Sequence, residues 1–289
     1  MSSAEQVPFV DLSRMQEPLW PALREAFDRV LAHGRYVLGP EVEGFEGELS
    51  RYTGIARTVG VSSGTDALLA SFLALDLAPG DEVLMTACTF ISTATSVMRA
   101  GLRPVFVDLA PGRFHPGAAE FERAWRPQVR AVVVVHLFGE PVEMAEISAL
   151  CKERGAVVVE DCAQAIGATF ADGSHVGCKG EVGTLSFFPA KNLGALGDGG
   201  AVLTEREDLA TAVRQIRQHG CAVRYRHDRL GGNFRLDALQ AALLSVLLGE
   251  LDSWVERRRD NARWYQACLE PLAAAHPDRI ALPRDAPGH

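Results

Sequence analysis

The sequence lacks the features of membrane and secreted proteins. No apolar stretch in its 289 residues approaches the roughly 20 residues needed to cross a bilayer. The first residues, MSSAEQVPFVDL, have neither the basic start nor the apolar run of a signal peptide. Six cysteines stand singly, without the C-x-x-C spacing of a zinc or redox site. We therefore expect a cytoplasmic protein with reduced thiols, no metal and no membrane partner.

The sequence also lacks a basic block. The formal net charge is −8, and the cluster Arg257–Arg259 lies in a stretch that is also rich in Asp and Glu. Both features argue against a nucleic-acid partner. Hydrophobic residues make up 47% and charged residues 23%, a balance typical of folded globular proteins. The length permits one large domain and the beginning of a second.

Short apolar runs alternate with amphipathic segments along most of the chain. Two of the runs, at 131–136 and 156–159, are almost continuously β-branched, which is typical of parallel strands buried on both faces. The alternation predicts a wound α/β sheet with helices on both faces. The predicted strands are 57–61, 82–85, 103–107, 131–136, 156–159 and 201–204. The predicted helices are 18–32, 40–51, 66–75, 92–100, 116–125, 143–154 and 208–219.

The alternation of apolar runs and amphipathic segments ends in a glycine-rich section, residues 167–200. From Leu236 a helical pattern runs toward Leu269, and we expect one long helix that links to a second domain. The predicted division is therefore a large domain at 1–235, and the linking helix with the start of a truncated small domain at 236–289.

A turn of small residues follows the first predicted strand. In it, Gly64 would let a ligand approach the backbone, and free N–H groups at a helix start attract anions. Thr65 adds a hydroxyl group. The turn is a candidate phosphate site, and the alternative is an ordinary Ser or Thr helix cap.

Asp161 comes directly after a predicted buried strand. Burying a carboxylate is unfavourable unless a cation meets it, and a protonated pyridine nitrogen is one such cation. The alternatives are a salt bridge to a nearby arginine and a helix cap.

Lys191 lies in the segment TLSFFPAKNLGALGDGG, among aromatic residues, small residues and glycines. Apolar surroundings lower the pKa of a lysine and favour an amine that reacts with a carbonyl group. The glycines are spaced almost as in a dinucleotide-binding fingerprint. That fingerprint requires a helix after the glycines, whereas a strand is predicted here, so we reject it. Further along, Asn233 and Arg235 in GGNFRLD are candidates for contacting a phosphate or a sugar.

Taken in order, these segments resemble the pyridoxal-phosphate (PLP) dependent sugar aminotransferases of the DegT/StrS family. The resemblance runs from Pro8 through the long helix and rests on five motifs: SGTDAL, CTFISTA, EDCAQAIGA, SFFPAKNLGALGDGG and GGNFRLDALQAA. It implies the fold-type I aminotransferase architecture, an α/β fold with a mostly parallel sheet. Family members continue with a longer small domain, so the C-terminal domain here is expected to be incomplete.

The resemblance also implies roles for individual residues. Lys191 matches the lysine that bonds PLP and acts as the catalytic base, and Asp161 matches the carboxylate that pairs with the pyridine nitrogen. Phe90 would stack on the ring, and Gln164 would lie near its O3′. The phosphate would be held by Gly64, Thr65 and Ser186, and by Asn233 of the neighbouring subunit, which makes the site a property of a homodimer. The positions where relatives contact the nucleotide-sugar are Gly34, Tyr36 and Arg235.

The implied activity is transfer of an amino group, usually from L-glutamate, to a keto group of a nucleotide-activated sugar. Family dehydratases that have histidine in place of the lysine are excluded by Lys191. Two alternatives stay open. One is amination of a ketocyclitol, and the other is a catalytically silent homologue with a regulatory or scaffold role.

Overall fold

The structure is a computed structural model that describes residues 10–223 and 225–283. The segment tested for a signal peptide and the start of the family resemblance at Pro8 lie largely or wholly outside the described residues. A seven-stranded sheet forms the centre of the molecule, in the order β1-β7-β6-β5-β4-β2-β3. Its strands are β1 (Arg57–Val61), β2 (Glu82–Thr86), β3 (Arg103–Val107), β4 (Val129–Val135), β5 (Val157–Asp161), β6 (Val182–Ser186) and β7 (Gly200–Thr204).

Only β7 runs against its neighbours in this sheet, since it pairs antiparallel with both β1 and β6. The other pairings are parallel, which confirms the predicted mostly parallel sheet. All five residues of β2 and of β7 are buried. Burial on both faces explains why the inner residues of these two strands are apolar rather than alternating with polar ones.

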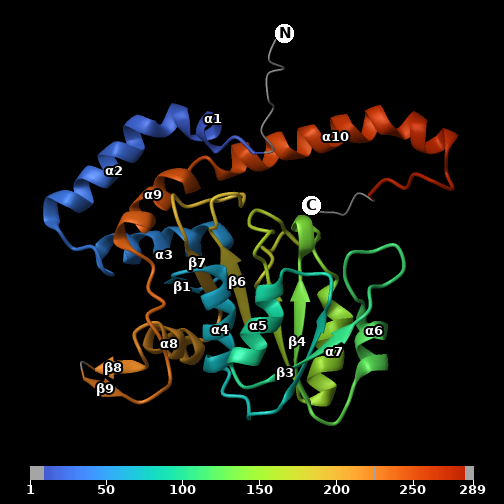
Figure 1. The fold of residues 1–289 in the computed structure, drawn as a ribbon, viewed down its shortest axis with the longest axis horizontal. Coiled ribbons are helices and arrows are strands. Elements are labelled where there is room, and N and C mark those ends of the chain that lie inside the picture. Colours follow the sequence, from blue (N-terminus) through green and yellow to red (C-terminus); the bar gives the residue numbers. More distant parts are fainter. Residues whose placement is uncertain (1–9, 224, 284–289) are drawn as a thin grey trace, which may run out of the picture.

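Helices cover both faces of the sheet, as predicted (Figure 1). One face packs against α4 (Gly64–Ala74), α5 (Ile91–Arg99) and α8 (Glu207–Ile216). The other face packs against two groups of helices. These are α2 (Trp20–His33), α3 (Pro40–Thr53) and α9 (Ala238–Leu248) in one group, and α6 (Ala118–Ala124) and α7 (Met144–Arg154) in the other.

The predicted single helix from Leu236 toward Leu269 is wrong. The segment forms two helices, α9 and α10 (Leu251–Ala275), bent by 59°. The break lies at Gly249 and Glu250, after which Leu251 and Trp254 turn back into the core. Beyond these two residues α10 is largely exposed, and it crosses the side of the molecule toward which β4 and β6 point (Figure 1). The apolar pattern continues across the bend, which is why it suggested one helix.

Strand β6 was not predicted, because its sequence VGTLS lies in the glycine-rich section and is short and mixed in polarity. The short elements α1 (Leu12–Gln16), η1 (Glu17–Leu19), η2 (Leu137–Gly139), β8 (Cys221–Val223) and β9 (Arg226–His227) were also not predicted. Within residues 10–223 and 225–283, no single helix is long and apolar enough to cross a membrane. The bent pair α9–α10 passes that test when joined, but α9 is buried against α2 and α3.

Candidate active site

A cleft of about 1440 Å³ opens at the carboxyl ends of the parallel strands, where open α/β sheets bind their ligands. The turn after β1, the segments after β4, β5 and β6, and one side of α10 line it. Segments far apart in the sequence therefore meet at this cleft. Seven of the predicted site residues line it: Gly64, Thr65, Phe90, Asp161, Gln164, Ser186 and Lys191.

The turn after β1 contains the helix cap that was considered for it, and it also lines the cleft. Ser63 caps α4 by accepting a hydrogen bond from the N–H of Asp66 at 3.0 Å. The N–H groups at the start of a helix have no acceptor within the helix, and Gly64 and Thr65, the first two residues of α4, line the cleft. Gly64 packs directly on Ser186 of β6, since a Cβ added at Gly64 would lie 2.6 Å from the Ser186 Cβ. Backbone donors and a hydroxyl group thus converge on one place, which suits a phosphate.

Asp161 ends β5 and is almost completely buried. One carboxylate oxygen accepts the N–H of Ala163 at 3.2 Å, and the other accepts the hydroxyl of Thr93 at 2.9 Å. Burial raises the pKa of the Asp161 carboxyl, while these two hydrogen bonds and the charge of Lys191 act in the opposite direction. Within the described part of the chain, no arginine forms a salt bridge with Asp161, so that alternative does not hold.

Lys191 projects from a tight turn after β6. Its N–H donates to the carbonyl of Phe188 at 2.8 Å, and a Cβ added at Gly194 would lie only 2.2 Å from the Pro189 carbonyl oxygen. Glycine is therefore required for this turn. Burial lowers the pKa of the Lys191 ammonium group, and the charge of Asp161 opposes this shift. The sequence has three lysines, and Lys152 and Lys179 do not line the cleft.

Gln164 and Phe90 both line the cleft. The Gln164 side-chain oxygen accepts the N–H of Phe138 at 3.0 Å, so the Gln164 amide nitrogen points away from this N–H group. Phe138 has a φ of 57°, unusual for a non-glycine residue, and this hydrogen bond helps to hold it. Phe90 stands at the start of α5 with a 69% exposed side chain, so its ring is free to contact a ligand.

The other four predicted residues do not line the cleft of their own chain. Gly34 caps the end of α2 in the left-handed conformation, and the carbonyl of Tyr36 accepts the N–H of Ala238. Arg235 pairs with Val61 in an isolated bridge, and Asn233 pairs with Gln218. These contacts place all four on segments around β1 and α9 rather than in the cleft.

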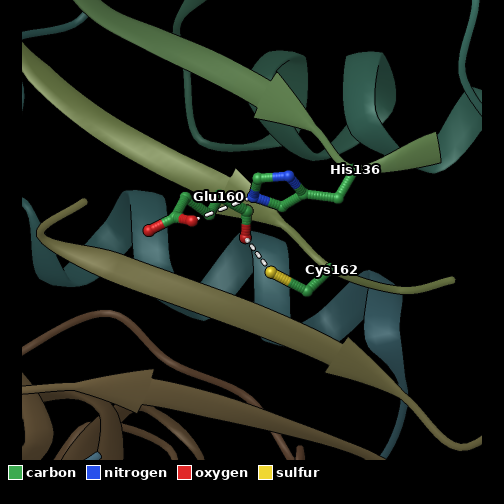
Figure 2. Close-up of side chains that lie close together, drawn as sticks. All are labelled: His136, Glu160 and Cys162. Atoms are coloured by element: carbon green, nitrogen blue, oxygen red, sulfur yellow. Dashed lines mark hydrogen bonds and ion pairs between the residues drawn. The ribbon is translucent and has the colours of Figure 1, made fainter. Parts of the chain in front are cut away.

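A buried cluster behind β5 has the residue types of a metal site. Figure 2 shows the His136 ring facing Glu160, with Cys162 next to the Glu160 backbone. The Glu160 carboxylate accepts hydrogen bonds from His136 and from the N–H groups of Gly177, Lys179 and Gly180. The second His136 nitrogen accepts the N–H of Val142 at 3.1 Å. The side-chain nitrogens of His136 and the carboxylate oxygens of Glu160 thus already have hydrogen-bond partners, which gives the two residues a structural role.

Sequence reasoning missed two features of the cleft. Thr93, inside the CTFISTA motif, bonds Asp161 but was not singled out. Arg258, Tyr265 and Gln266 of α10 line the cleft at helical spacing. A comparison of the polar residues on each face of the predicted long helix could have indicated the α10 residues. Nothing in the sequence alone pairs Thr93 with a residue 68 positions away.

The model of the DegT/DnrJ/EryC1/StrS aminotransferase family matches residues 21–284. The chain belongs to this family. That confirms the family and the aminotransferase class predicted from the motifs. A family member from Geobacillus stearothermophilus, a pleiotropic regulatory protein, is 42% identical over 98% of this chain and 75% of its own length. A dTDP-3-amino-3,4,6-trideoxy-α-D-glucose transaminase from Streptomyces venezuelae is 42% identical, over 98% of this chain and 73% of its own.

Solved structures of family members share the fold. DesV from S. venezuelae, in complex with a ketimine intermediate, superposes with a TM-score of 0.92 at 40% identity, covering 99% of this chain and 75% of DesV. NtdA from Bacillus subtilis, with bound cofactor PMP, gives 0.90 at 32% identity, covering 100% of this chain and 66% of NtdA. The predicted fold-type I aminotransferase architecture is thereby confirmed.

Proposed function

We propose that this DegT/StrS family member is a PLP-dependent aminotransferase that transfers an amino group, with L-glutamate as donor, to a keto group of a nucleotide-activated sugar. The observation that carries the proposal is the meeting of Lys191 and Asp161 in one cleft with the turn after β1, to which we assign phosphate binding. Names of relatives support the substrate class, since one of them is a transaminase of a dTDP-linked sugar.

The residues present fit PLP. A phosphate would be held by the α4 N-terminus at Gly64 and Thr65 together with the hydroxyl of Ser186, and the Gly64–Ser186 contact leaves no room for a larger residue. A protonated pyridine nitrogen would compensate the buried carboxylate of Asp161. Phe90 would cover the ring, and Gln164 would lie beside it.

The chain's own residues then have distinct tasks. Lys191 would hold the cofactor through its amine, and the free amine would act as the base that takes the α-proton of the donor amino acid. Its half-buried position favours the neutral amine needed for this task. Asp161 would pair as a carboxylate with the protonated ring nitrogen and so hold positive charge there. Bound PLP supplies the electron sink for the electrons left after proton removal.

We further propose that the chain works as a cytoplasmic homodimer in amino-sugar or polysaccharide biosynthesis. Gly34, Tyr36, Asn233 and Arg235 would contact the ligands of the second subunit's site, which agrees with their position outside the cleft of their own chain. The division into a cofactor-binding part, 1–235, and a linking part, 236–289, is likewise a proposal; the exposed course of α10 supports it, whereas α9 packs into the core of the first part.

The test is reduction of the PLP-loaded chain with borohydride, followed by peptide mass mapping. Because the sequence has three lysines, the expected result is a pyridoxyl mass on the Lys191 peptide and on neither the Lys152 nor the Lys179 peptide. The loaded chain should also lose its visible absorbance on addition of L-glutamate, and Lys191→Ala should show no such band. Lys179→Ala, an exposed lysine paired with Asp172, is the matched control.

A second candidate function is regulation without catalysis, favoured by the name of the Geobacillus relative. It predicts no reaction with L-glutamate even though PLP is bound. A loaded chain that keeps its absorbance band in glutamate would support regulation over transamination. If glutamate reacts, turnover with nucleotide-linked keto-sugars and with ketocyclitols decides the acceptor.

A further inference from the structure

A chain of two hydroxyl groups leads from the wall of the cleft to Asp161. Thr93 Oγ1 lies 2.9 Å from Asp161 Oδ2, and Thr89 Oγ1 lies 2.9 Å from Thr93 Oγ1. We propose that Thr93 is a positioning residue that sets the orientation of the Asp161 carboxylate toward the cofactor's ring nitrogen, with Thr89 fixing the Thr93 hydroxyl. This inference rests on the proposed function and adds residues to which no role has been assigned.

The direction of both hydrogen bonds follows from the donors present. An ionised carboxylate only accepts, so the single proton of the Thr93 hydroxyl must point to Asp161. Thr93 therefore accepts in its contact with Thr89, and Thr89 donates. The hydroxyl groups of Thr93 and Thr89 thus each have one defined orientation. The Asp161 carboxylate therefore accepts a hydrogen bond from a donor whose direction does not vary.

Burial separates the roles of the two threonines. Thr93 is fully buried and does not line the cleft, whereas Thr89 does. Thr93 therefore acts through Asp161 and touches no ligand itself. It lies in the first turn of α5, and its N–H donates to the carbonyl of Phe90 at 3.1 Å. The same turn thus places the ring-stacking candidate Phe90 and fixes the carboxylate of Asp161 on β5.

Few other groups act on Asp161. Its charged and titratable neighbours are Lys191 after β6, His136 after β4 and the adjacent Cys162. Among residues 10–223 and 225–283, Thr93 is the only side chain that donates a hydrogen bond to Asp161, the second donor being the Ala163 backbone. Removal of the Thr93 hydroxyl leaves one carboxylate oxygen without its protein donor and free to rotate toward the cavity.

The test uses the PLP-loaded chain with ¹⁵N in the pyridine ring, observed by NMR, because the ring-nitrogen shift reports protonation directly. Thr93→Val removes the hydroxyl and keeps the shape, and Thr93→Ser restores the hydroxyl. The matched control is Thr53→Val, a buried helical threonine that does not line the cleft and whose hydroxyl bonds the Leu49 carbonyl. Melting temperatures of all variants are measured alongside.

We expect Thr93→Val to move the ring-nitrogen signal from the protonated toward the unprotonated position and to slow the glutamate reaction by roughly 10–100-fold. Thr93→Ser and Thr53→Val should keep the wild-type signal. Thr89→Val should shift it in the same direction by less, and this variant decides the matter if Thr93→Val does not fold. If the wild-type signal is normal and the signal is unshifted in both Thr93→Val and Thr89→Val, the inference about Thr93 is overturned while the proposed function stands. Absence of bound PLP in the wild-type chain overturns the proposed function and this inference together.

Discussion

His136 and Glu160 form a completely buried pair in which the imidazole Nε2 lies 2.9 Å from a carboxylate oxygen. The other oxygen of Glu160 accepts the N–H groups of Lys179 and Gly180. The pair therefore ties the ends of β4 and β5 to the segment before β6. Since Asp161 directly follows Glu160 in β5, the pair also fixes the strand from which the catalytic candidate projects.

Replacing Glu160 by Gln should destabilise the chain strongly. The substitution puts an amide among donors that all point at a carboxylate, and breaking a buried ion pair by changing one partner typically costs about 3–5 kcal/mol. Urea denaturation followed by circular dichroism measures the free energy of unfolding. Asp172→Asn, which removes an exposed pair with Lys179, should change it little. Equal losses in the two variants would contradict this account of the buried cluster.

The same pair predicts a pH dependence of stability. Burial by itself raises the pKa of Glu160, but the hydrogen bond and charge of His136 and the N–H groups of Gly180 and Gly177 outweigh it, so the net pKa is lowered. A carboxyl whose folded pKa is lowered contributes stability above its unfolded pKa and loses it as the pH falls through the folded value. The wild-type urea midpoint should therefore drop below about pH 4, and the drop should be shallower in Glu160→Gln. Parallel curves for the two proteins would assign the acid sensitivity to other groups.

At Asp161, stability and function should conflict, because the ionised carboxylate that serves the reaction should destabilise the cofactor-free chain. Its pKa in the cofactor-free chain is raised, chiefly by burial, so ionisation at neutral pH opposes folding. For a raised pKa, the stabilising contribution is present below the unfolded pKa and is lost as the pH rises through the folded value. Asp161→Asn should therefore raise the melting temperature of the cofactor-free chain by a few degrees at pH 7. The same variant should slow the glutamate reaction by about 10²-fold or more. A melting temperature below that of wild type would show that the ionised carboxylate stabilises the empty site.

Much of the fold was accessible from the sequence because its signals are local. The β-branched runs at β4 and β5 and the capped helices α3 and α4 follow from periodicity and end signals alone. The α9–α10 bend was not accessible, because Leu251 and Trp254 continue the apolar pattern while packing in a new direction. Tertiary packing decides that bend, and periodicity does not report it.

Some residues of the candidate site could likewise be identified from the sequence, and others could not. Lys191, Asp161 and the Gly64 turn were identified because each is unusual in its local surroundings and belongs to a family motif. Thr93 is an ordinary threonine in a helix, and only the fold places it against Asp161. The α10 residues Arg258, Tyr265 and Gln266 reach the cleft only because the helix bends across the strand ends.

A methyl group at Gly64 should block the proposed phosphate position. In Gly64→Ala the new Cβ would lie 2.6 Å from the Ser186 Cβ, so either β6 or the turn must shift. We expect PLP affinity, measured by fluorescence titration, to fall by about 10-fold or more, by analogy with the loss of one or two charge-assisted hydrogen bonds. Gly44→Ala is the control, because Gly44 lies in α3 with nothing near its added Cβ. That variant should bind PLP normally and gain stability from the better helix former. Normal PLP affinity in Gly64→Ala would place the phosphate elsewhere in the cleft.

A mixture of two defective variants should recover activity if the sites are shared between subunits. Lys191→Ala removes the lysine proposed to bind the cofactor in its own cleft, and Asn233→Ala removes the residue proposed to reach the partner's phosphate. In a mixed dimer both defects fall on one site and leave the other intact, so an equal mixture should show about a quarter of wild-type activity. The assay is run at a PLP concentration that saturates wild type and leaves Asn233→Ala largely empty, after the subunits have exchanged. If the sites are not shared, each cleft carries its own defect, and the mixture shows only the residual activities that the two variants contribute separately. Because Asn233 does not line the cleft of its own chain, recovery is the outcome that the geometry favours.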